Sequence, residues 1–214
     1  ESILNDRDES GLSVLEKLAG GKAVLVLLGD AFHREGEWEM DSSIATAQRI
    51  AELMIEHPSS VYSLIGNHDY LTGDVRLTTR SASGRQRIWQ PGLRLRERMT
   101  QLYGEEYVQR FERVFLANHA LMAVGRRVLA VHAGPVREAV SLEQIARTNV
   151  LDARNPVVQQ ATWSRFHERS NHASPFTGRH ADDFRKRMGQ PEALLFLGHS
   201  HRRELPWHWS PRAP

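Results

Sequence analysis

Residues of the types that bind metal ions follow four short apolar segments of this chain. The four groups are GD at 29–30, GNHD at 66–69, HAG at 132–134 and GHSH at 198–201. Carboxylate, amide and imidazole groups are ligands for manganese, iron and zinc. Glycine beside them lets the backbone turn sharply and lets side chains approach one another. The pattern therefore predicts a metal site assembled from segments that are distant in sequence.

Each group alone has an ordinary structural explanation. A Gly-Asp pair after a strand is usually a turn, and a lone histidine there is usually a hydrogen-bonded structural residue. His199 and His201 are more informative, because side chains two positions apart after a strand point to the same side. Four such groups in one chain favour a shared site. The candidate ligands are Asp30, Asn67, His132, His199 and His201.

Buried strands are expected to position these groups, because each group directly follows an apolar run. In α/β sheets, ligand sites lie beyond the carboxyl ends of the strands. Apolar runs predict strands at 23–28, 61–65, 120–124, 128–131 and 193–197. Periodicity and capping residues predict helices at 12–19, 41–56, 105–115, 141–148 and 181–188. Residues 72–92 show little periodicity and are expected to form a long loop or insertion.

The composition is that of an ordinary globular domain and excludes several functional classes. The 214 residues include no cysteine, so thiolate metal sites and disulfides are excluded. The longest apolar run is six residues, at 23–28, and we expect no membrane segment. No nucleic-acid-binding motif is visible, and no nucleic-acid partner is expected. We expect a cytoplasmic protein.

The net charge of +2 is small, but the basic residues are grouped. Many of them lie within 76–98 and 179–187. Such groups are usually solvated faces of helices and loops. The alternative is a positively charged rim that attracts an anionic substrate.

Together the four groups resemble the ordered motifs of the calcineurin-like metallophosphoesterases. GDAFHREG at 29–36 resembles the family's Gly-Asp-x-x-Asp-Arg-Gly motif, and GNHD at 66–69 matches its third motif. VHAGP at 131–135 and GHSH at 198–201 correspond to the last two. The family's first motif, Asp-x-His, does not occur before Asp30 and is expected upstream of residue 1. We therefore expect residues 1–214 to form a single, N-terminally incomplete metallophosphoesterase domain.

The resemblance implies an α/β fold, an α/β/α sandwich of two mixed β-sheets flanked by helices. It also implies two divalent metal ions, with manganese expected and iron or zinc as alternatives. Asp30 would bridge the two ions, Asn67, His132 and His199 would complete one shell, and His201 would bind the other ion. His68 would be the catalytic acid, and Arg34 would bind the phosphate.

The segments between the motifs indicate a branch of the family. Residues 102–135 and the later TWSRF and FTGRH sequences resemble phosphoprotein phosphatases, and GNHDYLTGDVR resembles their Shewanella-like bacterial type. The resemblance implies hydrolysis of phosphomonoesters by in-line attack of a metal-bridging hydroxide. The expected substrate is a phosphorylated protein or a small phosphoester.

One substitution leaves a second enzymatic function open, and a function without chemistry is a separate alternative. His33 stands where the protein phosphatases have an Asp that orients the catalytic histidine. Diadenosine tetraphosphate hydrolases of the same superfamily also have a non-acidic residue there and tend to have Gly-Asn-His-Asp. A diadenosine polyphosphate hydrolase is therefore the alternative enzyme, and a degenerate, non-catalytic binding module is the alternative without chemistry.

Overall fold

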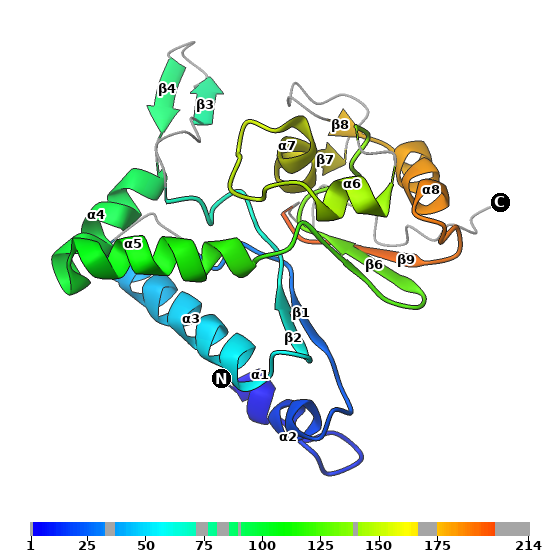
Figure 1. Ribbon diagram of the computed structural model, residues 1–214, viewed down its shortest axis with the longest axis horizontal. Helices are drawn as coiled ribbons and strands as arrows, with labels where there is room; N and C mark the ends of the chain where they lie inside the picture. The colour runs from blue at the N-terminus through cyan, green and yellow to red at the C-terminus, as the bar shows by residue number, and fades with distance from the viewer. Residues whose placement is uncertain are drawn as a thin grey trace.

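The computed structural model describes residues 2–32, 37–71, 77–80, 86–89, 91–138, 141–166 and 175–199. It is an α/β fold in which helices flank short sheets (Figure 1). The strands are β1 (Leu25–Leu27), β2 (Val61–Ser63), β3 (Leu77–Arg80), β4 (Gln86–Trp89), β5 (Met122–Val124), β6 (Val128–Val131), β7 (Arg165–Phe166), β8 (Pro175–Phe176) and β9 (Leu194–Leu197). The helices are α1 (Ser2–Asn5), α2 (Val14–Ala19), α3 (Glu37–Glu56), α4 (Pro91–Tyr103), α5 (Glu105–Val114), α6 (Leu142–Ala146), α7 (Pro156–Trp163) and α8 (Gly178–Arg187), with a 3₁₀ turn at Leu116–Asn118.

Two strand groups carry the ends that matter for the site. Strands β1 and β2 are parallel, with Leu25 opposite Val61. Strand β6 pairs antiparallel with β5 and parallel with β9, so that Val131 lies opposite Leu197. Because the strands within each parallel pair run in the same direction, their carboxyl ends lie at the same edge. Residues that follow β1 and β2, or β6 and β9, are therefore brought together.

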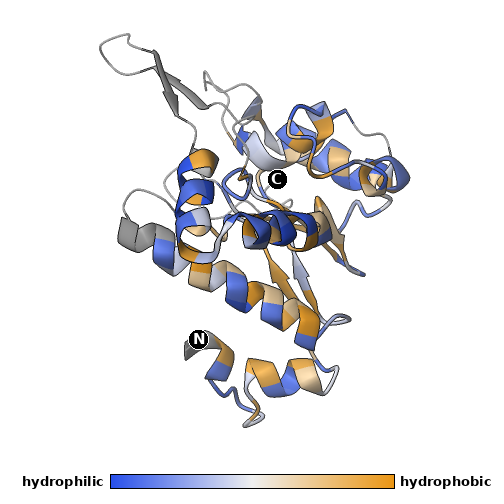
Figure 2. Cartoon of the chain, turned by 60° about the vertical axis from the view of Figure 1, so that its left-hand side comes forward, coloured by the Kyte–Doolittle hydropathy of each residue, from blue (hydrophilic) through white to orange (hydrophobic). Residues whose placement is uncertain are grey.

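One apolar core connects the two strand groups. In Figure 1, α3 to α5 lie on one side of β1 and β2, and α6 to α8 gather near β6 and β9. The core joins residues from all these regions, including Phe32, Ile44, Ile65, Leu95, Phe111, Leu129, Val131, Val158 and Phe184. Figure 2 shows that β1 is apolar, whereas the helices alternate between apolar and polar positions. No helix in the described ranges is both long and apolar enough to span a bilayer.

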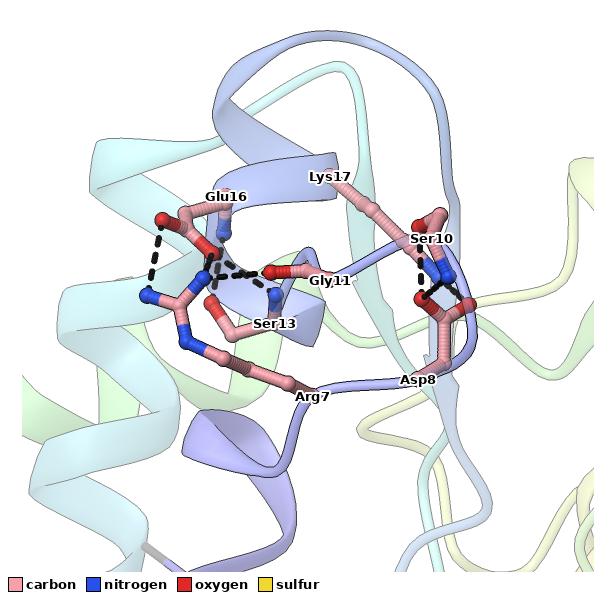
Figure 3. Close-up of polar contacts among 7 residues, drawn as sticks. All are labelled: Arg7, Asp8, Ser10, Gly11, Ser13, Glu16 and Lys17. Carbon is pink, nitrogen blue, oxygen red and sulfur yellow. Dashed lines mark hydrogen bonds and ion pairs between the residues drawn. The ribbon is translucent and has the colours of Figure 1, made fainter.

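Side chains in the N-terminal segment fix the start of α2. Ser13 is the N-cap, and its hydroxyl accepts a hydrogen bond from the Glu16 amide at 3.2 Å, while the Glu16 carboxylate accepts the Ser13 amide at 2.7 Å (Figure 3). These bonds from Ser13 lower the pKa of Glu16. A hydrogen bond from Lys17 lowers the pKa of Asp8 to about 2. This reciprocal capping explains why the predicted helix at 12–19 begins at Val14.

The prediction of a long loop at 72–92 was wrong in part. Strands β3 and β4 pair antiparallel within it, with Leu77 opposite Trp89, and α4 begins at Pro91. Periodicity missed the hairpin because its two strands are short and its pairing depends on the partner strand. Helix α4 was also missed, although Leu95 and Met99 lie one turn apart and are fully buried.

Candidate metal centre

Three predicted ligands lie together at the ends of three strands. Asp30 follows β1, His132 follows β6 and His199 follows β9. One potential ligand atom of each lies within 4.8 Å of the others. The amide of Gly198 donates to the carbonyl oxygen of His132 at 2.8 Å, which joins the ends of β6 and β9. Strand pairing thus brings His132 and His199 together, and a contact between His132 and the carbonyl oxygen of Leu28 joins them to the end of β1.

Asn67 belongs to the same group. Its Oδ1 lies 3.1 Å from Nε2 of His132, and Oδ2 of Asp30 lies 3.5 Å from the same nitrogen. Both Asn67 and His132 are buried, at 4% and 1% exposed. All four ligands predicted for one ion therefore lie in one place.

The hydrogen bonding of His132 prepares it to bind a cation. Its Nδ1 lies 2.6 Å from the carbonyl oxygen of Leu28, which can only accept a hydrogen bond. The proton of the neutral ring is therefore on Nδ1, and Nε2 presents a lone pair toward Asp30 and Asn67. Three acceptor atoms then face one another, an arrangement that a bound cation would stabilise. The donor set of carboxylate, amide oxygen and imidazole fits a divalent ion such as manganese, iron or zinc.

An unusual backbone conformation places Asp30. Its φ is 57°, and that of Gly29 is 90°, so the chain makes a left-handed turn directly after β1. A residue other than glycine in this region costs about 1–3 kcal/mol. Gly66 packs against this turn so closely that an added Cβ would lie 2.3 Å from Oδ1 of Asp30. His199 also has a positive φ, of 46°. Strain is thus concentrated at two of the three grouped ligands.

The carboxylate of Asp69 holds the turn at Asp30 in place. It is fully buried and accepts three backbone hydrogen bonds, from Asp30 at 2.9 Å, Ala31 at 2.8 Å and Gly66 at 2.7 Å. These bonds connect the segment after β1 to the segment after β2. Sequence reasoning gave Asp69 no role beyond membership of the GNHD motif. Its function depends on two segments being neighbours, which the sequence does not display.

Tyr70 anchors the same segment from the other side. Its hydroxyl donates to the carbonyl oxygen of Val150 at 2.7 Å. Burial, with the nearby carboxylates of Asp69 and Asp152, raises the pKa of this hydroxyl well above its usual value. Tyr70 therefore remains a neutral donor and helps to fix the GNHD segment.

Of the remaining predicted site residues, one adjoins the ligand group and the others lie outside the described residues. The amide of His68 donates to Oδ1 of Asp30 at 2.9 Å, so the residue adjoins the ligand group without being one of its grouped ligands. Arg34 and His201 lie outside the described residues, as does His33. Trp163, which the sequence analysis did not single out, contacts the His199 ring edge-on at a centroid distance of 6.0 Å.

Comparisons with known proteins agree with this geometry. The sequence pattern of the calcineurin-like phosphoesterases matches residues 9–203. A solved structure, a protein serine/threonine phosphatase from Saccharomyces cerevisiae described as similar to human phosphatase PP5, superposes with a TM-score of 0.60 at 18% identity. The match covers 86% of this chain and 53% of that one, so this chain spans about half its length. A search of curated proteins gave no match. The extent of the family match shows that the chain belongs to the calcineurin-like phosphoesterases, a family of metal-dependent hydrolases.

Proposed function

We propose that this chain hydrolyses phosphomonoesters and that phosphorylated proteins are its preferred substrates. The observation that carries the proposal is the convergence of Asp30, Asn67, His132 and His199 at the strand ends. The fold shared with a protein serine/threonine phosphatase supports the substrate class. So does the resemblance of residues 102–135 to that branch.

The four converging residues would hold one divalent ion, and Asp30 and His201 would contribute to a second. When bound, such ions acidify a water molecule and neutralise phosphate oxygens. We propose manganese as the ion, with iron or zinc as alternatives. The left-handed turn at Asp30 and the glycine at position 66 keep the Asp30 carboxylate close to both His68 and His132.

His68 and Arg34 are the proposed catalytic residues. The amide of His68 donates to the Asp30 carboxylate, so the residue would lie beside a phosphoryl group bound at the metal centre. Its imidazole would protonate the leaving alkoxide. Arg34 follows Asp30 by four residues, and its guanidinium would bind two phosphate oxygens at once.

The alternative substrate is a dinucleoside polyphosphate, which His33 and the GNHD sequence favour. A comparison of kcat/KM on a phosphoserine peptide and on diadenosine tetraphosphate, with the manganese-loaded protein, separates the two. We expect the peptide to be preferred. A preference for the dinucleotide of more than about tenfold, or about 1.4 kcal/mol of transition-state binding, would assign the chain to the alternative. Absence of hydrolysis of both, with metal bound, would favour a binding module.

A further inference from the structure

A cavity lined by charged side chains lies beside the segment that follows His132. Its volume is about 480 Å³, and its lining residues are Arg137, His180, Asp183, Lys186 and Arg187. The guanidinium of Arg187 donates to the carbonyl oxygens of Arg137 and Val136, at 2.9 and 3.0 Å. These bonds attach the C-terminal end of α8 to the segment after β6. The cavity is therefore built by two elements that are fixed to each other.

Positive charge dominates this cavity. Three of the lining residues, Arg137, Lys186 and Arg187, are cations, and among the described lining residues Asp183 carries the only carboxylate. The side chains of Arg137 and Lys186 form no ion pair within the part of the chain that the structure describes. The nearby carboxylate of Glu138 is occupied by the Gln160 amide, at 2.6 Å. Three cations against one carboxylate leave the lining residues with an excess of two positive charges.

His180 adds a hydrogen-bond donor to the lining. Its Nδ1 accepts the backbone amide of Thr177 at 3.1 Å, in the capping box that starts α8. The proton of the neutral ring is therefore on Nε2, which becomes a donor. With the guanidinium of Arg137 and the ammonium of Lys186, the cavity offers donors that suit a carboxylate or a phosphoryl group.

The basic segment at 76–98 is a weaker candidate for such a role. Arg98 is paired with Asp41 at 2.7 Å, and Arg96 is paired with Glu105 and with Glu112. These ion pairs use the arginines of α4 to connect helices. Arg137 and Lys186, which form no ion pair with the residues that the structure describes, are more available to an incoming anion.

The cavity is within reach of a peptide bound at the metal centre. Arg137 follows His132 by five residues, and five fully extended residues span at most about 18 Å. An extended peptide bridges that distance with about six residues or fewer. A substrate whose phosphoryl group is at the metal centre can therefore place a neighbouring side chain in the cavity.

We propose that this cavity is an accessory site for an acidic side chain of the phosphoprotein substrate. The inference rests on the proposed function, because the phosphorylated residue has to occupy the metal centre. Arg137 and Lys186 would bind the acidic group, and Arg187 would hold the two walls together. The site would select substrates with acidic residues within about six positions of the phosphorylated residue.

The test compares two phosphoserine peptides that differ only in acidic or neutral flanking residues. We expect wild-type protein to hydrolyse the acidic peptide with a kcat/KM about tenfold higher, as one charge-assisted hydrogen bond would give. In the double variant Arg137→Gln and Lys186→Gln this ratio should fall toward one. The matched double variant Arg126→Gln and Arg127→Gln loses the same charge in the turn between β5 and β6 and should keep the wild-type ratio.

Equal kcat/KM values for both peptides in wild-type protein, or a ratio that the Arg137 and Lys186 changes leave intact, would overturn the inference. If neither peptide is hydrolysed, the proposed function is wrong. Binding of the unphosphorylated acidic peptide then tests whether the cavity binds acidic side chains. Fluorescence anisotropy should then show salt-sensitive binding that the Arg137 and Lys186 changes weaken at least about threefold. Absence of binding, or binding that these changes leave intact, would count against the cavity.

Discussion

His68 illustrates how neighbouring residues of one motif receive different roles. Asn67 points an oxygen at the ligand His132, whereas His68 contacts Asp30 through its backbone amide. The side chain of His68 is not one of the grouped ligands, and we propose it as the catalytic acid. The two roles can be tested separately. Loss of a metal ligand lowers metal affinity, whereas loss of a proton donor lowers turnover and leaves metal content unchanged.

The variant His68→Ala should lower turnover of alkyl phosphates by roughly 10²- to 10⁴-fold. The loss should be smaller for an aryl phosphate with an acidic phenol, because that leaving group departs without a proton. Steady-state kinetics on both substrates, with metal content measured in parallel, provide the check. An equal loss on the two substrates would argue against general acid catalysis by His68.

His119 is a buried titratable residue outside the ligand group. It is 4% exposed, its Nδ1 bonds the carbonyl oxygen of Phe115 at 2.8 Å, and its Nε2 has no hydrogen-bond partner within the described ranges. Burial lowers its pKa below 6.5, against the opposing effect of the Asp69 carboxylate. The unfolded chain therefore takes up this proton at a higher pH than the folded chain.

It follows that protonation of His119 should destabilise the fold as the pH falls below about 6.5. The variant His119→Gln should remove that contribution, which is at most about 1.4 kcal/mol per pH unit. Urea unfolding of metal-free protein between about pH 5 and 7.5 measures the slope. The same slope in wild type and variant would show that His119 does not contribute to acid sensitivity.

At this scale the sequence predicted which polar residues gather at the strand ends better than it predicted what holds them there. Asp30, Asn67, His132 and His199 could be identified because each follows an apolar run within a recognisable motif. Asp69 and Trp163 could not, because their roles depend on contacts with the segment after β1 and with His199. Such contacts exist only after the strands have paired.

The elements of the fold were predictable where a single segment determines its own structure. Strands β1, β2, β6 and β9 lie within the predicted apolar runs, and the α5 region was predicted from its periodic apolar face. The β3–β4 hairpin and α4 were missed, because cross-strand pairing and burial of an arginine-rich helix depend on tertiary context. The ends of β1 and β2 are positioned by such context too.

Asp69→Asn tests how those two strand ends are held together. An asparagine places an N–H group where a carboxylate oxygen now accepts backbone amides, so at least one of the three bonds is lost. We expect the affinity for manganese to fall about 10- to 100-fold, as for other residues that orient metal ligands. Stability should also fall, by about 1–3 kcal/mol, because a buried donor is left unsatisfied.

Metal-induced thermal stabilisation distinguishes positioning from general destabilisation. In Asp69→Asn the increase in Tm on adding manganese should be much smaller than in wild type. Leu95→Ala, on the buried face of α4, should lower the Tm of the metal-free protein but retain the metal-induced increase. If both variants retained the metal-induced increase in Tm, Asp69 would stabilise the fold without positioning metal ligands.

At the scale of the whole molecule, charge and strand order act together. The net charge of +2 conceals an uneven distribution. Two arginines of α4 pair between helices, whereas Arg137 and Lys186, beside a cavity, form no ion pair among the described residues. The strand ends gather acceptor atoms at one place in the same molecule. The positive charges suit an anionic substrate directly. The acceptor atoms suit one only when they hold a cation, so the proposed function depends first on the metal centre.

Calorimetric titration of the metal-free protein with manganese tests that centre most directly. We expect tight binding by wild type and a loss of affinity on the order of 100-fold or more in His132→Ala, which removes a predicted ligand that Leu28 orients. His57→Ala, in the connection between α3 and β2, should bind as wild type does. No binding of manganese, iron or zinc by wild type, or full affinity in His132→Ala, would contradict the assignment of these strand ends as a metal centre.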